Sequence, residues 1–355
     1  MITNFKNTDN IDNFLEKELN MFNNIGNKLL KDNKIGVIIL AGGQGTRLGL
    51  EKPKGTLLLN NKSLFQIHIE KLQNMNTHIP LYIMTSVNTH DDTINFFEEN
   101  NYFNYKKNNI IFFQQGNNYC LDKIGGNKII KEIKNNQPIY ATCPNGNGGI
   151  YEAIHSNCPN INNSIYDDFV KRGLEYIFIQ NVDNPIVKLC DPIFLGYHNY
   201  YNLEISCKVC PKHDPDEKVG IFCYRDDKPN IVEYYELQDD MRYLKDKNNN
   251  LIYNQANISI HILSVNFIDK IKDIKLEYHY AKKKIEYWDD KLKRTIKPET
   301  ENGYKPEYFI FDMFKYCPKD KMRLLTINRD SEFCPIKNKD DIILTEKIIN
   351  SSGII

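Results

Sequence analysis

The sequence lacks an excess of charge of either sign and any long hydrophobic run. Its 355 residues contain 46 Lys and Arg against 46 Asp and Glu, so no overall field attracts it to nucleic acid or to an anionic membrane. The longest apolar run, residues 37–41, is far shorter than the roughly 20 residues that span a bilayer, and the N-terminal segment lacks the apolar centre of a signal peptide. We therefore expect a cytoplasmic protein without nucleic-acid or membrane partners, which binds anions at a local site.

The cysteines do not form the pattern of a disulfide framework. Their number, nine, is odd, and they are spread along the chain without the dense spacing of a small secreted domain, which favours reduced thiols. Cys207 and Cys210 form a CxxC motif in an apolar run, where residues three apart on a strand face opposite sides. A structural zinc site needs four ligands and no second pair lies nearby, so zinc or redox chemistry here is an unfavoured alternative.

Short apolar runs alternate with helical patterns from Lys34 onward. This alternation predicts an α/β fold with a doubly wound, mostly parallel, Rossmann-like mixed sheet, and the 41% of hydrophobic residues suffice for one large core. Apolar runs after residue 200 predict an antiparallel extension of the same sheet that forms the second half of a cleft. Residues 1–33 have helical spacing, and residues 341–355 are expected to form a tail with a short helix.

A glycine-rich loop follows the first apolar strand. It has the sequence LAGGQGTRLG over residues 40–49, with Pro53-Lys54-Gly55 shortly after. Glycines let the backbone approach phosphate oxygens and leave N–H groups free to donate, and ligands of open α/β sheets bind at the carboxyl ends of strands. A dinucleotide fingerprint lacks its third small residue, because Leu48 stands there, and a kinase-like P-loop lacks Gly-Lys-Ser/Thr. A purely structural turn leaves the cations Arg47 and Lys54 unexplained.

The loop, with its GGxGTRLG and PKG motifs, resembles the signature of UDP-sugar pyrophosphorylases, in the LAGGQGTRLG version of the N-acetylhexosamine enzymes. Further segments similar to this family follow in family order and extend the resemblance over about residues 34–338. They are YIMTS (82–86), FFQQG (112–116), GNGGIY (146–151), VDNPIVK (182–188), VGIFC (219–223), VEYYE (232–236), ANI (256–258), KKKIEYWD (282–289), IKPETENGYKPEYFIFDMF (296–314) and FCPIKN (333–338).

The resemblance implies the nucleotide-diphospho-sugar transferase fold and an activity. The expected reaction converts UTP and N-acetylglucosamine 1-phosphate to UDP-N-acetylglucosamine and pyrophosphate, with Mg²⁺ or Mn²⁺ as cofactor. Alternatives are another sugar 1-phosphate, N-acetylgalactosamine or glucose 1-phosphate, or a silent homologue that only binds a nucleotide sugar. The expected domains are a helical segment at residues 1–33, a nucleotidyltransferase domain at 34–340 and the tail. No further C-terminal domain is expected. Because that domain is linked to dimer contacts in the family, we expect the chain to be a monomer.

The resemblance also implies roles for individual residues. Arg47 and Lys54 are the expected catalytic cations, and Asp183, at the end of an apolar run, is the expected metal ligand. The expected nucleotide-binding residues are Leu40, Ala41, Gly42, Gly43, Gly45, Thr46, Gln115 and Gly146. The expected sugar-phosphate-binding residues are Asn147, Gly220, Glu233, Tyr234, Asn257, Lys305, Phe309 and Lys337.

Two positions depart from the family pattern. Asn145 replaces the aspartate that precedes GNGG in the family, which removes a negative charge near the nucleotide. Residues 117–119 read Asn-Asn-Tyr where the family has a Met-Leu-Pro run. The wall of the base pocket is therefore expected to differ from that of the family.

Overall fold

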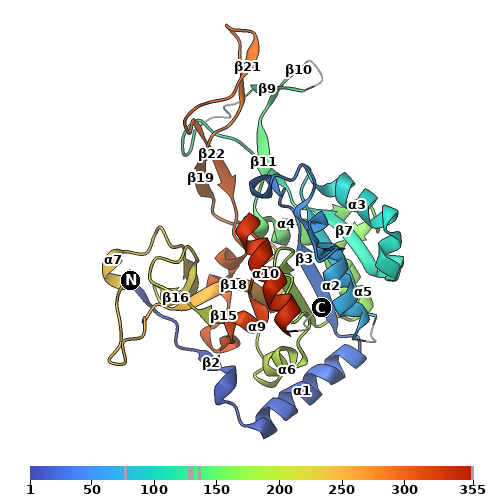
Figure 1. Ribbon diagram of the computed structural model, residues 1–355, viewed down its shortest axis with the longest axis vertical. Helices are drawn as coiled ribbons and strands as arrows, with labels where there is room; N and C mark the ends of the chain where they lie inside the picture. Colours follow the sequence, from blue (N-terminus) through green and yellow to red (C-terminus); the bar gives the residue numbers. More distant parts are fainter. Residues whose placement is uncertain (76–77, 127–130, 135–136, 353–355) are drawn as a thin grey trace.

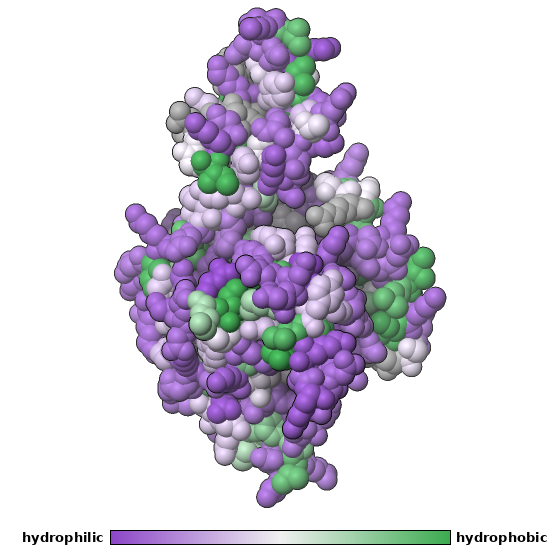
Figure 2. All heavy atoms as spheres, turned by 90° about the vertical axis from the view of Figure 1, so that its left-hand side faces the viewer, coloured by the Kyte–Doolittle hydropathy of each residue, from purple (hydrophilic) through white to green (hydrophobic). Residues whose placement is uncertain are grey.

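The computed structural model describes residues 1–75, 78–126, 131–134 and 137–352, and shows a broad body with a narrow arm projecting from one end (Figure 1). Two segments far apart in sequence, within residues 117–144 and 279–307, form this arm. On the face drawn in Figure 2, hydrophobic residues lie in small separate groups among hydrophilic ones. No helix in the described ranges is long and apolar enough to cross a membrane.

Eleven of the described strands form one sheet across the body. Its main order is β2 (Thr8–Asn10), β23 (Met322–Thr326), β15 (Ile205–Pro211), β18 (Gln255–Ser264), β14 (Tyr176–Asn181), β3 (Ile35–Leu40), β6 (Leu81–Thr85) and β7 (Ile110–Gln114). A side branch contains β1 (Ile2–Asn4), β16 (Ile221–Arg225) and β17 (Lys228–Val232). Along the main order all neighbours are parallel except those of β18, which confirms the mostly parallel sheet.

The late strands differ in place from the predicted extension. β18 is antiparallel to both β14 and β15 and lies in the middle of the sheet, while β16, β17 and β1 supply the antiparallel branch. The second half of β18, residues 260–264, is buried throughout, as expected of a strand covered on both faces. An antiparallel extension therefore exists, but one of its expected strands is central.

Helices cover both faces of the sheet, and its strands alternate between them. In β3, Val37 and Ile39 belong to one apolar cluster, while Ile38 and Leu40 belong to another on the opposite face. The first face is covered by α1 (Glu16–Lys31), α2 (Leu64–Gln73), α3 (His90–Glu99), α6 (Pro192–Tyr200) and α10 (Lys339–Ser352). The second is covered by α4 (Ile150–His155), α5 (Ile165–Arg172), α8 (Val265–Lys270) and the 3₁₀ helix η7 (Ile310–Tyr316).

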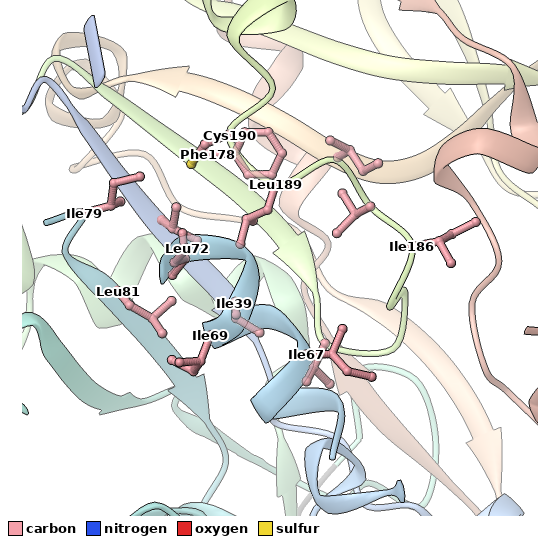
Figure 3. Packing of buried hydrophobic residues seen from close by; sticks show 14 of the residues in the cluster. Ile39, Ile67, Ile69, Leu72, Ile79, Leu81, Phe178, Ile186, Leu189 and Cys190 are labelled. Carbon is pink, nitrogen blue, oxygen red and sulfur yellow. The ribbon is translucent and has the colours of Figure 1, made fainter. Parts of the chain in front are cut away.

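The packing of α2 illustrates the first face. Its Ile69 and Leu72 point toward Ile39 of β3 and Leu81 of β6, as Figure 3 shows. Ser63 caps the helix by accepting a hydrogen bond from the backbone N–H of Gln66. Helix α2 therefore packs on the strands β3 and β6, and the carboxyl ends of these strands form part of the site described below.

Helix α1 confirms the helical spacing within residues 1–33, but this segment is not only helical. Its strands β1 and β2 pair with β16 and β23, so the segment contributes to the main sheet. α1 approaches α6 closely, because a Cβ at Gly26 would lie 1.9 Å from the carbonyl oxygen of Pro192. The two strands have three residues each and lack an alternating apolar pattern, so the sequence did not reveal them. The division of the chain into domains stays a prediction.

The C-terminal segment is docked on the body. The predicted short helix is α10, and the Cys334 Sγ lies 3.1 Å from the Oγ1 of its buried Thr345. All nine cysteines are free and buried, which confirms the expectation of reduced thiols. Cys207 and Cys210 belong to the two opposite apolar clusters. Within the described ranges, no group of three or more His, Cys, Asp and Glu could hold a metal ion.

The remaining elements are short. The strands of the arm and its base are β8 (Asn117–Tyr119), β9 (Lys131–Lys134), β10 (Gln137–Tyr140), β11 (Thr142–Pro144), β19 (His279–Lys283), β20 (Tyr287–Asp289), β21 (Arg294–Ile296) and β22 (Gly303–Glu307). The others are β4 (Leu58–Leu59), β5 (Lys62–Ser63), β12 (Asn157–Cys158), β13 (Asn163–Ser164), α7 (Asp239–Arg242), α9 (Arg329–Glu332), η1 (Ile11–Asn13), η2 (Thr46–Leu48), η3 (Lys54–Thr56), η4 (Asn101–Asn104), η5 (Lys107–Asn109), η6 (Asn147–Gly149) and η8 (Lys319–Lys321).

Candidate active site

A cavity of about 440 Å³ opens at the carboxyl ends of β3, β6, β7 and β14. This is where ligands of open α/β sheets bind. The base of the arm, at β11 and β22, forms its opposite wall. Its lining residues are Leu40, Gly42, Gly43, Gln44, Thr46, Lys54, Met84, Asn88, Gln115, Cys143, Pro144, Gly146, Asn147, Asn181, Val182, Asp183, Lys305 and Glu307.

The glycine loop is held against the cavity by backbone contacts. A Cβ at Gly42 would lie 2.3 Å from Nε2 of Gln115, so only glycine fits between the loop and that amide. The Ser86 hydroxyl donates to the carbonyl oxygen of Gly42 at 2.8 Å, and the N–H of Lys54 donates to that of Gly43 at 3.2 Å. The loop therefore has the shape of a backbone cradle for an anion.

The predicted loop residues have two kinds of position. Leu40, Gly42, Gly43 and Thr46 line the cavity, as expected. The others support the loop from behind: the N–H of buried Ala41 donates to the carbonyl oxygen of Met84 at 2.7 Å, and the carbonyl oxygen of Gly45 accepts from the N–H of Leu48 at 2.9 Å. The backbone of Arg47 lies in η2, and its side chain is outside the described part of the structure.

Lys54 and Asp183 meet across the cavity. The Nζ of Lys54 donates to Oδ2 of Asp183 at 2.7 Å, and each side chain is 16% exposed. Asp183 lies in the loop after β14, whose backbone is fixed from two sides. The Nε2 of His68 lies 3.0 Å from the carbonyl oxygen of Val182, and the N–H of Ile336 donates to that of Asp183 at 2.9 Å. One ammonium group and one carboxylate thus stand beside the glycine loop in fixed positions.

Gln115 carries an orphaned polar atom at the cavity. Its side chain is buried, and its Oε1 has no hydrogen-bond partner among the described residues. Gly146, opposite, has φ of 86°, and a Cβ there would lie 2.5 Å from the carbonyl oxygen of Tyr308. Burying an unpaired amide oxygen is costly, so this position suits a ligand that donates a hydrogen bond.

Asn145, the departure from the family pattern, lies behind Gly146. Its Nδ2 lies 3.4 Å from Oε2 of Glu152, and its Oδ1 is buried without a partner in the described part of the chain. Asn147 lines the cavity and accepts the N–H of Ile310 at 3.0 Å. Asn147 therefore shares this cavity with Gln115 and Gly146, and its role at the sugar phosphate stays a prediction.

The predicted sugar residues gather partly at a second hollow of about 310 Å³. Glu233 lines this hollow, and a Cβ at Gly220 would lie 3.0 Å from its Oε1. The N–H of Asn257 donates to the carbonyl oxygen of Gly220 at 2.8 Å, so these three residues lie together. Lys305 lines the first cavity instead. Neither hollow is lined by Tyr234 or Lys337, which are exposed.

A histidine that sequence reasoning did not find lies in the second hollow. The Nε2 of His279 lies 2.9 Å from Oδ1 of Asp312, and its ring lies 4.4 Å from that of Phe309. Burial lowers the pKa of His279, but the hydrogen bond and charge of Asp312 outweigh it, so the pKa is raised. Burial raises the pKa of Glu233, aided by Glu236, whereas His279 and Lys337 oppose this shift.

Comparison with known proteins places the chain in a family. Residues 4–351 match the family model described as UTP–glucose-1-phosphate uridylyltransferase. The UDP-N-acetylglucosamine pyrophosphorylase of Saccharomyces cerevisiae is 37% identical over 335 residues, which cover 91% of this chain and 68% of the yeast protein. This chain is a member of the UTP–glucose-1-phosphate uridylyltransferase family. The resemblance inferred from its motifs is thereby confirmed.

Solved structures of family members agree with this fold. The Entamoeba histolytica protein provisionally named UDP-N-acetylglucosamine pyrophosphorylase has a TM-score of 0.87 at 30% identity and covers 100% of this chain and 88% of that one. The UDP-N-acetylglucosamine pyrophosphorylase of Trypanosoma brucei, solved with an inhibitor, has a TM-score of 0.81 at 30% identity, covering 94% and 68%. UDP-glucose pyrophosphorylase of Leishmania major, at 18% identity, shows the same fold.

Proposed function

We propose that this chain is a uridylyltransferase that converts UTP and N-acetylglucosamine 1-phosphate to UDP-N-acetylglucosamine and pyrophosphate. The observation that carries this proposal is the single cavity onto which the glycine loop, the Lys54–Asp183 pair and Gln115 all face. Relatives that are 33–37% identical bear UDP-N-acetylglucosamine or UDP-N-acetylhexosamine pyrophosphorylase names. The structures of glucose enzymes are only 17–20% identical and support the fold alone.

The chemistry is an in-line displacement at the α-phosphorus of UTP by a sugar-phosphate oxygen. Two anions must be brought together, so the protein contributes by alignment and by neutralising charge on the transferring group. The N–H groups of the glycine loop and the ammonium of Lys54 lie where the triphosphate enters. Lys305, on the opposite wall, is placed to meet the phosphate of the sugar. Arg47 stays a predicted catalytic cation.

The uracil ring suits the end of the cavity at Gln115. The N3–H of uracil donates and its carbonyl groups accept, and a glutamine amide offers the complementary atoms. The unpaired Oε1 of Gln115 is such an acceptor, and Gly42 and Gly146 keep both walls free of side chains. Cytosine has an acceptor at N3, so an Oε1 aimed at N3 faces a lone pair, and only a shift of the ring brings the amino group of cytosine to it. A preference for UTP over CTP follows from this contact.

The donor set fits Mg²⁺ bound jointly by the protein and its substrate. Mg²⁺ prefers oxygen ligands and is usually held by one or two carboxylates together with phosphates and water. Asp183 is the carboxylate beside the glycine loop, and no cluster in the described ranges could bind a metal by itself. When bound, the ion would supply charge for the phosphate oxygens. Asp183 would hold it and orient Lys54. Mn²⁺ is an alternative ion.

The acceptor sugar suits the second hollow. Glu233 lines this hollow and offers a carboxylate to sugar hydroxyls. Gly220 and Asn257 lie beside Glu233, outside the lining, and Asn257 stays the predicted contact of the acetamido group. A site that hydrogen-bonds a substituent disfavours the analogue that lacks it, because its own groups stay unpaired. Discrimination against glucose 1-phosphate is therefore expected to exceed that against N-acetylgalactosamine 1-phosphate, which keeps the acetamido group. A cytoplasmic location and a monomeric state stay predictions.

Pyrophosphate release from UTP with each of the three sugar 1-phosphates tests the proposal. We expect kcat/KM to be highest for N-acetylglucosamine 1-phosphate, and glucose 1-phosphate to be worse by on the order of a thousandfold. The variant Asn257→Ala is expected to reduce this ratio. Equal use of glucose 1-phosphate would exclude the hexosamine assignment, and the absence of release with all three would exclude the enzyme.

A further inference from the structure

Two thiols lie together at the base of the arm, beside the nucleotide cavity. The short strands β8 and β11 pair antiparallel, with Asn118 opposite Cys143, and the N–H of Cys120 donates to the carbonyl oxygen of Ala141 at 2.9 Å. Cys120 and Cys143 therefore occupy diagonal positions on one face of the ribbon. They form a small apolar cluster with Ala141 and Ile285.

One of these thiols faces the cavity. Cys143 lines it and leads directly into Pro144 and Gly146, which line it as well. Its Sγ also contacts the carbonyl oxygen of Pro306 at 3.9 Å, and Pro306 follows Lys305 on β22. β11 and β22 lie side by side in Figure 1. The thiol pair therefore lies next to Pro144 and Gly146, which line the cavity, and next to the strand that carries Lys305, the predicted phosphate-binding lysine.

The surroundings favour a thiolate on Cys120. A hydrogen bond from the Cys143 thiol and the charge of Lys305 lower the pKa of Cys120 against the opposing effect of burial. The same hydrogen bond, with burial, raises the pKa of Cys143. One sulfur is thus the better nucleophile and its neighbour keeps the proton. Both residues are buried, so a small oxidant reaches the pair through the cavity that Cys143 lines.

We propose that Cys120 and Cys143 form an oxidation site at which a hydroperoxide closes a disulfide and thereby blocks the nucleotide cavity. The Cys120 thiolate attacks one oxygen of hydrogen peroxide, the O–O bond breaks, and a sulfenic acid forms. The hydroxide that leaves takes up the proton that the Cys120 thiol lost on ionising, which gives the first water. The sulfur of Cys143 then attacks that of Cys120, and the hydroxyl group leaves with the Cys143 proton as the second water. Two thiols and one hydrogen peroxide give one disulfide and two waters.

The disulfide affects the site through two contacts. It joins Cys143 of β11, where β11 enters the cavity, to Cys120, the residue after β8, so the path of Pro144 to Gly146 changes. It also removes the thiolate that attracts Lys305. Conversely, UTP bound in the cavity covers Cys143, which lines it, so UTP is expected to slow the oxidation. The effect on turnover rests on the proposed function, whereas formation of the disulfide does not.

The test treats the purified, reduced full chain with hydrogen peroxide. Peptide mapping under non-reducing conditions is expected to show a Cys120–Cys143 link. Its formation is expected to slow about tenfold when UTP is saturating, because access to Cys143 falls. Turnover is expected to fall at least tenfold and to return with dithiothreitol. Cys120→Ser is expected to lose the link and at least nine-tenths of the inactivation rate. The inactivation of each protein is measured relative to the activity of the same protein before treatment.

Cys158→Ser is the matched control, because Cys158 is buried in a different apolar cluster. It is expected to be inactivated at the wild-type rate. If Cys120→Ser does not fold, Cys120→Ala replaces it. The absence of the linked peptide from oxidised wild type, or an unchanged inactivation rate in the Cys120 variant, would overturn the proposal. If the chain has no turnover, the proposed function fails, but calorimetry of UTP binding before and after oxidation still tests whether the disulfide blocks the cavity. The failure of one proposal is therefore distinguishable from the failure of the other.

Discussion

The Nζ of Lys54 lies 2.7 Å from Oδ2 of Asp183, so the loops that follow β3 and β14 are joined by an ion pair at the mouth of the cavity. The two strands are neighbours and parallel, which brings their carboxyl ends to the same edge. Both side chains are largely covered, and neither has another side-chain ion pair among the described residues. A bound phosphate group can take over the ammonium of Lys54, which leaves the carboxylate of Asp183 free to bind a cation.

Replacing either member of this pair is expected to reduce turnover far more than stability. We expect Lys54→Ala to lower kcat by about 100-fold, as removal of one preorganised donor does in other enzymes. Asp183→Asn removes the charge that would hold Mg²⁺ and that orients Lys54, and we expect a loss of about the same size. Lys62→Ala, which breaks the exposed pair with Glu70, is the control and is expected to keep wild-type kcat. Steady-state kinetics checks this, and kcat within twofold of wild type in Lys54→Ala would contradict the role of the loop.

The amide of Gln115 is expected to decide nucleotide affinity. Gln115→Glu keeps an acceptor for N3–H but loses the N–H donor to a uracil carbonyl group and buries a carboxylate beside the phosphates. We therefore expect Kd for UTP to rise at least tenfold, about 1.4 kcal/mol or more. KM for the sugar phosphate is expected to change little. Gln114→Glu, one residue earlier and exposed, is the control. Calorimetry with UTP and CTP measures the effect, and equal losses in both glutamate variants would argue against a base contact.

The His279–Asp312 pair predicts a pH-dependent contribution to stability. The pKa of His279 is raised in the folded state, so the stabilisation is fully present below the ordinary histidine pKa and is lost as pH rises through the folded value. Relative to His279→Gln, we expect wild type to gain about 1 kcal/mol below pH 6 and the gain to decline above it. Urea unfolding of both proteins across this range measures the difference. A difference that grows with pH would contradict the assignment.

A buried ion triad is expected to control global stability. The Nζ of Lys208, which is fully buried, lies 2.6 Å from Asp191 Oδ2 and 2.6 Å from Glu332 Oε2. Lys208→Met leaves Asp191 without its cation and leaves Glu332 only Lys188, whose Nζ lies 3.8 Å from Oε1. We therefore expect a loss of about 3–5 kcal/mol in the free energy of unfolding. Lys28→Met, at an exposed pair, is expected to lose less than about 1 kcal/mol. Similar values for both variants would show that the triad does not stabilise the fold.

The sequence predicted the parallel half of the sheet because β3, β6, β7 and β14 are continuous apolar runs between helical patterns. It did not predict that β18 is central, since the partners of a strand depend on contacts with distant segments. Polar three-residue strands such as β1 and β2 also carry no periodic signal. The local pattern therefore gave the elements, while their order needed the structure.

The site shows a similar division. The motifs predicted the residues of the glycine loop, Lys54, Gln115 and Asp183, and the structure brings these to one cavity. Nothing in the sequence indicated the His279–Asp312 pair, because 33 residues separate its members and neither belongs to a short catalytic motif. Cys143 was missed for the same reason, since its partner lies on another strand.

The central position of β18 constrains how the chain folds as it is synthesised. Strands β3, β6, β7 and β14 can assemble once residue 181 has emerged, but the open edge of β14 has no neighbour until residues 255–264 follow. An unpaired edge of buried apolar residues is a template for association with other chains. Ribosome-bound intermediates that end between these points therefore expose an aggregation-prone edge, and chaperones are expected to engage the nascent chain in that interval.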